Sequence, residues 1–429
     1  MRRRRLLILL PSWLVPLVLL VGLQTYLAFR EPIFSPIDEL QHTGYVRTIA
    51  MQAQLPVYGE NENDPTLVAL YFQKSAWGVP RLSPARLNYE ALQFPLFYLL
   101  AAPVYKLLAA DPRAAIYGVR LLNVLLSGVV LVLLVVLLRR AYRFDQLRAM
   151  AIALPLALIP GVTLRSSQVT NEVLATVLIT ALLAGLVVRK PSRPGLQSFL
   201  EGAALGLAVL AKLTAVAIIP AVLIGWLTRR ARRESLVAGT LGAVVTTAPW
   251  IVWSVGVYGS PVPFLSRHPK VFSGLTQFVP PHTLSSWLAL VRHLVYFFWM
   301  PWEWRVPDGW SWFPRLLVVA ASILIAAATI ASTRLVLHAG PTDARRALAI
   351  SAMTFGGFVV SYGVFVAALQ RIWPTDLREL YVFLGAVAIL LGPVAARLPR
   401  SVLLGFSGSV VVSWLMLDAG YYVIGRCAC

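Results

Sequence analysis

Residues 118–138 read GVRLLNVLLSGVVLVLLVVLL, an apolar run of the length that crosses a bilayer as one helix. The pair Arg139–Arg140 follows directly, and basic residues at the end of such a run mark the cytoplasmic side of a membrane. The whole chain shares this character, with 58% hydrophobic residues, 13% charged residues and a mean hydropathy of +0.74. The sequence therefore predicts an all-α polytopic membrane protein, without a separate stretch for a soluble catalytic domain.

Comparable runs cover much of the remaining chain. We expect a first helix at about 6–29, retained after the basic start Met1–Arg5, because the run is too long for an ordinary signal peptide and lacks a clear cleavage site. Residues 199–228 have basic clusters on both flanks, which predicts a hairpin that turns near Lys212 rather than one long helix. The total is about eleven transmembrane helices, the other spans being expected at 118–138, 149–166, 171–188, 236–257, 313–333, 347–369, 378–396 and 401–423.

The distribution of charge sets the predicted topology. Twenty of the 38 Lys and Arg residues fall in short segments on one side, which predicts a cytoplasmic N-terminus and an external C-terminus. The heavy use of arginine hints at a bacterial source, and hence at the inner (plasma) membrane. The net charge of +20 arises from these topology signals and forms no basic stripe interleaved with aromatic residues, so we expect no nucleic-acid partner.

Two long segments, about 30–117 and 258–312, are expected outside the membrane. In the first, the aromatic run Leu92–Leu100 could itself span the bilayer, but that would move Arg139–Arg140 to the outside. We therefore expect an amphipathic helix at the interface, juxtamembrane within the first external loop. The tryptophans that close the second segment are typical of an interfacial belt, and stacking on a substrate is the alternative.

The most informative polar segment is Ser35-Pro36-Ile37-Asp38-Glu39-Leu40-Gln41-His42. Acids are scarce in this chain, and Asp38 and His42 are spaced to share one face of a helix. A helix that begins at Pro36, with Ser35 as its N-cap, would give the acids a capping role. The alternative is chemistry, with Asp38 as a general base. A divalent cation held by His42 and the two acids is a further possibility.

Three other candidates lie at the outer ends of predicted spans. Lys212 could bind a lipid-linked phosphate or extend to the interface. Glu172 could cap the next helix or face the same cavity as Asp38. Arg371 could contact a phosphate or simply end a helix. The sequence contains no phosphate-binding Gly-x-x-x-x-Gly-Lys loop, no His-Glu-x-x-His motif and no Gly-x-Ser-x-Gly elbow. Its two cysteines, Cys427 and Cys429, cannot form a disulfide framework.

The order of these features resembles the membrane-embedded GT-C glycosyltransferases, the superfamily of protein O-mannosyltransferases and lipid A aminoarabinose transferases. The resemblance covers most of the chain, and its most specific element is the external pair Asp38–Glu39. Other elements depart from the usual pattern. His-Pro-Pro-Leu-Tyr-Tyr is replaced by Gln93–Tyr98, an Asn-Asp corner by Asn171–Glu172, and Gln-Gly-Arg-Tyr by the shortened Gln370–Trp373.

The resemblance implies one GT-C-like transmembrane domain over residues 1–429. It also implies transfer of a sugar from a polyprenyl-phosphate donor to a lipid, glycan or protein acceptor on the external side. Asp38 would be the base, with Glu39 orienting the acceptor or holding the helix. His42 would either contact the acceptor or support the site from behind, and further substrate contacts would come from Glu172, Lys212 and Arg371. One base and one displacement predict inversion, whereas a second carboxylate acting as nucleophile would give retention. No cofactor is implied. A transporter or flippase of lipid-linked glycans and a non-catalytic envelope scaffold are the competing functions.

Overall fold

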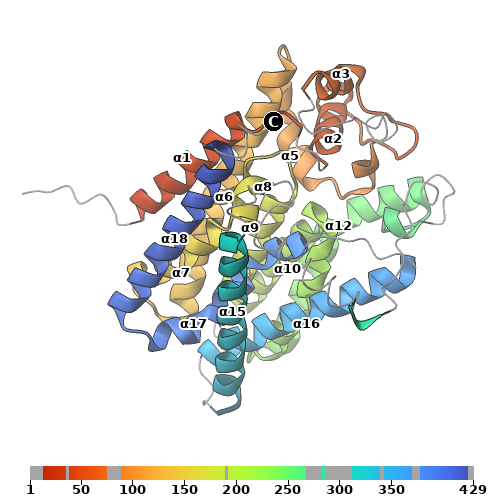
Figure 1. Cartoon of the computed structure of the whole chain (residues 1–429). Coiled ribbons are helices and arrows are strands. Elements are labelled where there is room, and N and C mark those ends of the chain that lie inside the picture. The colour runs from red at the N-terminus through yellow and green to blue at the C-terminus, as the bar shows by residue number, and fades with distance from the viewer. Residues whose placement is uncertain are drawn as a thin grey trace, which may run out of the picture.

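The computed structural model of the chain describes residues 13–34, 38–74, 88–188, 192–266, 283–285, 312–338, 343–369 and 377–423. Helices form nearly all of the regular structure in these ranges (Figure 1). They are α1 (Leu14–Arg30), α2 (Glu39–Gln52), α3 (Pro65–Lys74), η1 (Tyr89–Leu92), α5 (Leu96–Leu107), α6 (Pro112–Tyr142), α7 (Gln146–Ala157), α8 (Pro160–Ser166), α9 (Glu172–Leu186), α10 (Pro194–Ala211), η2 (Leu213–Ile218), α11 (Ile219–Leu227), α12 (Arg232–Tyr258), η3 (Pro263–Leu265), α15 (Trp312–His338), α16 (Asp343–Leu369), η5 (Leu377–Phe383), α17 (Leu384–Arg397) and α18 (Arg400–Val423).

These elements confirm the all-α polytopic architecture that the sequence predicts. Five helices in the described residues are long and apolar enough to cross a membrane, and α7 with α8 forms one bent pair that would add a sixth span. Shorter apolar helices, among them α1, α9 and α5, lie beside them. The total of eleven spans stays a prediction. Most of the second external segment, 258–312, lies outside the described residues.

One predicted span has a different form. Residues 149–166 were expected as a single helix, but α7 ends at Ala157 and α8 begins at Pro160 with its axis bent by 75°. Pro155 lacks the N–H that would continue the hydrogen-bond ladder, and Pro160 occupies the first turn of a new helix, where proline is favoured. The two prolines therefore break the span.

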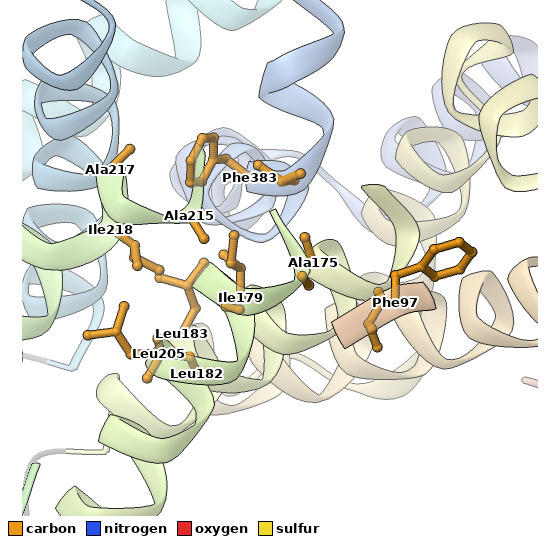
Figure 2. Packing of buried hydrophobic residues seen from close by; sticks show 14 of the residues in the cluster. Phe97, Ala175, Ile179, Leu182, Leu183, Leu205, Ala215, Ala217, Ile218 and Phe383 are labelled. Atoms are coloured by element: carbon orange, nitrogen blue, oxygen red, sulfur yellow. The ribbon is translucent and has the colours of Figure 1, made fainter. Parts of the chain in front are cut away.

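Helix α9 lies in the interior of the bundle. Its residues are apolar around most of the circumference, as expected of a helix that is covered on all sides. Figure 2 shows side chains of α9 packed with Phe97 of α5, Leu205 of α10, Ile218 of η2 and Phe383 of η5. This packing fixes the start of α9, which carries Glu172, relative to the elements that surround it.

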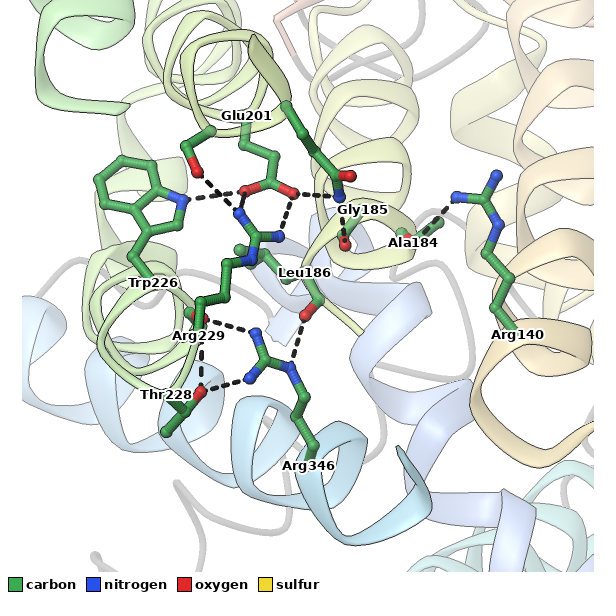
Figure 3. Close-up of polar contacts among 12 residues, drawn as sticks. Arg140, Ala184, Gly185, Leu186, Glu201, Trp226, Thr228, Arg229 and Arg346 are labelled. Carbon is green, nitrogen blue, oxygen red and sulfur yellow. Dashed lines mark hydrogen bonds and ion pairs between the residues drawn. The ribbon is translucent and has the colours of Figure 1, made fainter. Parts of the chain in front are cut away.

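The hairpin predicted within 199–228 has its break at Lys212. Helix α10 ends at Ala211, the Lys212 backbone is extended, and the chain continues as η2 and α11. The far ends of the segment meet again, because Arg229 donates two hydrogen bonds to the Glu201 carboxylate at 2.6 and 2.8 Å (Figure 3). The indole of Trp226 donates to the same carboxylate at 2.9 Å. A buried ion pair thus closes the base of the hairpin, opposite to Lys212.

Helix α10 also lies unusually close to α12. A Cβ on Gly202 would sit 1.8 Å from the carbonyl oxygen of Gly239, and a Cβ on Gly242 would meet the carbonyl oxygen of Phe199 at 2.2 Å. Small residues permit this backbone contact in membrane helix pairs, where dispersion rather than water exclusion drives association. The contact holds α10, and therefore Lys212 at its end, in place.

Two polar layers lie at opposite ends of α6. Arg120, near its start, bonds to Glu39, whereas Arg140, twenty residues later, donates to the carbonyl of Ala184 at 3.0 Å. At 1.5 Å per residue the two arginines are about 30 Å apart, which matches the thickness of a bilayer core. Arg346 lies at the same end as Arg140, where it donates to the carbonyl oxygens of Leu186 and Gly225 (Figure 3). Arg140 and Arg346, both predicted to be cytoplasmic, therefore lie at the same end of the bundle.

Cysteine labelling tests this sidedness. In a background with Cys427 and Cys429 replaced by serine, Glu60→Cys and Arg232→Cys each place a thiol at an exposed position, at opposite ends of the bundle. In intact cells a membrane-impermeant maleimide should label position 60 and should reach position 232 only after the membrane is opened. Labelling of both positions from the same side would contradict the predicted topology.

Candidate functional site

Asp38 immediately precedes α2, in a left-handed backbone conformation with φ +63° and ψ −15°. This conformation costs energy for a residue other than glycine, although Asp and Asn tolerate it best. The carboxylate makes no capping hydrogen bond to the helix. It instead accepts a hydrogen bond from the hydroxyl of Tyr89 and is partly exposed. The capping role considered from the sequence is therefore wrong for Asp38.

The predicted start of this helix was also wrong. Ser35 and Pro36 were expected as its N-cap and first residue, but α2 begins at Glu39. Residues 35–37 themselves lie outside the described part of the chain. Because Asp38 precedes the helix, the two adjacent acids leave the backbone in different directions.

Glu39 is fully buried between α2, α6 and the corner before α9. Arg120 donates to its two oxygens, from Nε to Oε1 at 2.7 Å and from Nη2 to Oε2 at 2.6 Å. The backbone N–H of Val169 donates to Oε1 at 2.9 Å. Such a bidentate, charge-assisted pair is strong and directional. Glu39 therefore holds the helix, one of the two roles expected from the sequence, and is not placed to orient an acceptor.

Arg120 also closes the end of α1. Its guanidinium donates to the carbonyl oxygens of Ala28 at 2.7 Å, Glu31 at 3.0 Å and Pro32 at 2.8 Å. The last carbonyls of a helix have no partner within the helix, and this arginine supplies one. A single buried side chain thus joins α1, α2 and α6. The signal that could have revealed it was present, since Arg120 is a charged residue inside a predicted span.

His42 faces away from solvent, into a cluster with α5 and η1. Its Nδ1 lies 2.8 Å from the hydroxyl of Tyr98, and that hydroxyl donates to Glu90 at 3.2 Å. The ring of Tyr45 stacks on Tyr98 with centroids 3.8 Å apart. Burial, with smaller effects from Tyr258 and Glu90, raises the pKa of Tyr45 well above its ordinary value. His42 therefore supports the site from behind, as the sequence allowed, and does not line it for an acceptor.

Tyr89 and Glu90 were not among the residues singled out from the sequence. Both lie on the short helix η1, directly before the run Gln93–Tyr98. The scarcity of acids, which pointed to Asp38, applies equally to Glu90. The role of Tyr89 carried no such signal, because it depends on how residues 51 positions apart come together.

Lys212 and Glu172 form a buried ion pair, with 2.8 Å between Nζ and Oε1. Lys212 follows the last residue of α10, and Glu172 is the first residue of α9. Lys212 therefore does not extend to the interface as a lone lysine would. Glu172 also lines a narrow cavity with Arg165, Ser127 and Tyr381, with room for about one water molecule.

The corner between α8 and α9 connects the two halves of the site. Val169 binds Glu39, and three residues later Glu172 binds Lys212. Asn123 on α6 fixes the corner by donating to the carbonyls of Gln168 at 2.7 Å and Thr170 at 2.9 Å. The packing of Phe94, which follows η1, against Leu210 adds a second link between η1 and the end of α10. Asp38 and Lys212 therefore belong to the same end of the bundle.

Two further possibilities from the sequence are a cation site at His42 and a phosphate contact at Arg371. Within the described ranges no group of three His, Cys, Asp or Glu side chains could hold a metal ion. The cation site considered from His42 and the two acids does not form there, since Glu39 pairs with Arg120 and His42 with Tyr98. Arg371, the remaining candidate, lies outside the described residues.

Solved structures identify the fold. The structure is similar to that of ArnT from Cupriavidus metallidurans bound to undecaprenyl phosphate, with a TM-score of 0.53 and 16% sequence identity over 96% of this chain and 75% of that one. The apo state of the same protein gives a TM-score of 0.51 with 17% identity and the same coverage. The chain has the fold of the GT-C glycosyltransferases. No protein-family model matches the sequence, and no curated protein matches it.

The GT-C fold confirms the resemblance inferred from the order of short motifs. At this level of identity the likeness concerns the arrangement of the helices. An Archaeoglobus fulgidus oligosaccharyltransferase in complex with Zn and sulfate is also similar, with a TM-score of 0.49, 13% identity and coverage of 95% of this chain and 53% of that one. The roles of the individual residues rest on the contacts described above.

Proposed function

We propose that this protein transfers a sugar from a polyprenyl-phosphate donor to a hydroxyl-bearing acceptor, at the end of the bundle that carries Asp38. The observation that carries the proposal is the state of Asp38, a partly exposed carboxylate in left-handed backbone with a phenol as its partner. Strained backbone of this kind is concentrated at active sites. ArnT, which has the same fold, has been solved with undecaprenyl phosphate bound.

The proposed reaction uses Asp38 as general base. An acceptor hydroxyl is a poor nucleophile, so the carboxylate takes its proton as the new bond to the anomeric carbon forms. The bond from that carbon to the phosphate oxygen breaks, and the electron pair leaves with the lipid phosphate. One displacement inverts the anomeric carbon. Retention would require a second carboxylate as nucleophile, and Glu39 does not suit that role because Arg120 binds both of its oxygens.

The leaving phosphate needs a cation near the membrane boundary, and Lys212 is the proposed group. Its present partner, Glu172, is a carboxylate, which a lipid phosphate would replace or join. Arg371 is proposed as a second phosphate contact on the strength of the motif alone. We place the reaction on the external face of a bacterial inner membrane, with a lipid, glycan or protein as acceptor.

The test is donor turnover by the purified protein in proteoliposomes. A panel of undecaprenyl-phosphate monosaccharides, each supplied with membrane extract as acceptor, should contain at least one donor that releases undecaprenyl phosphate only when the protein is present. The anomeric configuration of the product then decides between inversion and retention. Absence of release across the panel, with folded protein and bound lipid phosphate, would contradict the proposal.

Replacement of Lys212 by methionine should weaken binding of undecaprenyl phosphate by about 10- to 100-fold, because an anion in a partly desolvated site loses its charge-assisted partner. The measurement is a binding titration in detergent. Glu172→Gln is the matched control, since it keeps the ammonium and removes its present partner. The double variant removes both members of the ion pair, so its affinity does not include the effect of Glu172 having lost Lys212. If the double variant binds undecaprenyl phosphate with unchanged affinity, Lys212 serves only to neutralise the charge of Glu172.

Two observations favour transport of a lipid-linked glycan as the second candidate function. A buried ion pair lies beside the helix break at Lys212, and α7 and α8 form a broken pair. Transporters place their binding sites at such discontinuous helices. Proteoliposomes separate the two functions, since a flippase would move a fluorescent lipid-linked sugar across the bilayer without releasing lipid phosphate. A non-catalytic scaffold would do neither.

A further inference from the structure

We infer that Tyr89 is a positioning residue for the carboxylate of Asp38, and that η1 is the platform that presents it. The inference rests on the proposed role of Asp38 as base and adds to it a residue that no motif indicates. The phenol of Tyr89 donates directly to Oδ1 of Asp38. Rotation of the carboxylate about its Cβ–Cγ bond would change which lone pair faces the acceptor hydroxyl. A fixed hydrogen-bond donor on one oxygen prevents that rotation.

The platform is held on more than one side. Its next residue, Glu90, accepts from the hydroxyl of Tyr98 on α5 and lies 3.4 Å from Nδ1 of His42. Behind them, the hydroxyl of Tyr258 accepts from the N–H of Tyr58 at 3.0 Å and donates to the carbonyl of Ala91 at 3.4 Å. Glu90 and Ala91 are both buried. With its neighbours fixed in this way, Tyr89 has little freedom to leave Asp38.

Both partners of the contact are thereby fixed from different parts of the chain. The backbone of Asp38 is fixed in two ways. The next residue, Glu39, is bound to Arg120, and the carbonyl oxygen of Asp38 accepts the N–H of His42 at 2.9 Å. Tyr89 is fixed by η1. The cluster of His42, Tyr98 and Glu90 does not touch the proposed reaction directly, and its function is then to hold the phenol opposite the base.

A hydrogen bond donated to a carboxylate favours the charged form, so its loss should make protonation easier. Tyr89→Phe should move the pH midpoint of Asp38 protonation upward by about one pH unit, the size expected for one lost bond to a charged group. Other ionisable groups lie on α2 and on the elements packed against it, and they stay the same in both tyrosine variants. They are Glu39 and His42 on α2, Glu90 on η1, Tyr98 on α5 and Arg120 on α6.

Carbodiimide labelling measures this midpoint without any substrate, because the reagent reacts with the protonated carboxyl. The full-length protein in lipid nanodiscs is labelled between pH 4 and pH 8, and mass spectrometry quantifies modification at position 38. Asp38→Asn identifies the signal. Tyr258→Phe is the matched comparison, because it removes a phenol that supports η1 and leaves the direct bond from Tyr89 to Asp38 in place.

The expected result is an upward shift in Tyr89→Phe and a distinctly smaller shift in Tyr258→Phe, which loosens η1 but keeps the phenol that bonds to Asp38. In active protein the acidic limb of kcat should move by the same amount, with the KM for the donor unchanged. An unshifted midpoint in Tyr89→Phe, or an equal shift in Tyr258→Phe, would overturn the inference. If no donor is turned over, the labelling still decides whether Tyr89 positions Asp38. Failure of this inference can therefore be distinguished from failure of the proposed function.

Discussion

Replacement of Asp38 by asparagine should reduce turnover of the sugar donor by a factor on the order of 100 to 10,000, the usual contribution of general acid–base catalysis. Asparagine has nearly the same size and also tolerates left-handed backbone. The Asp38 side chain makes no capping hydrogen bond, so α2 does not depend on its charge. The variant should therefore fold, and should bind undecaprenyl phosphate as the natural sequence does.

The matched control is Asp111→Asn. Asp111 is an exposed acid that caps α6 through the N–H of Arg113 at 2.9 Å, and asparagine caps as well as aspartate. Its turnover should stay within about twofold of the natural sequence, because surface substitutions of this kind change little. Turnover is measured as release of undecaprenyl phosphate in proteoliposomes at equal amounts of folded protein. Near-normal turnover in Asp38→Asn would remove the catalytic role and favour transport or a scaffold.

The helices of this protein could be predicted from sequence because the bilayer imposes a simple rule on them. Apolar runs predicted 171–188 and 236–257, and the structure has α9 at Glu172–Leu186 and α12 at Arg232–Tyr258. The break at Lys212 was predicted by basic clusters on both flanks. The bend between α7 and α8 was missed, although Pro155 and Pro160 stand where the ladder is interrupted.

The candidate site was only partly predictable. Asp38 and Glu39 were found because acids are scarce. Which of the two holds the fold and which faces the proposed site depends on Arg120, which is 81 positions from Glu39. Tyr89 was missed for a similar reason, since nothing near it in the sequence distinguishes it from other aromatic residues. Local patterns reveal which residues are unusual, whereas the pairing of those residues is decided by long-range packing.

Glu39→Gln should destabilise the folded protein by about 3 to 5 kcal/mol, because it leaves the buried guanidinium of Arg120 without its counter-charge. The loss should be visible as a lower midpoint of unfolding in an SDS titration. Asp38→Asn should change that midpoint little, since Asp38 is partly exposed and bonded to a neutral phenol. Substitution of Glu39 is thus expected to lower mainly stability, and substitution of Asp38 mainly turnover.

The buried ion pair of Glu201 and Arg229, at the other end of the bundle, serves as the comparison for Glu39 and Arg120. Glu201→Gln also leaves an arginine, Arg229, with a broken bidentate contact, and should lower the unfolding midpoint by a similar amount. Because Glu201 is remote from Asp38, the fraction that remains folded should turn over donor normally. Glu39→Gln should keep part of its turnover per folded molecule, and more than Asp38→Asn does. A fully stable but inactive Glu39→Gln would contradict the assignment of Glu39 to stability, and would show that it acts on the reaction, either itself or by positioning Asp38.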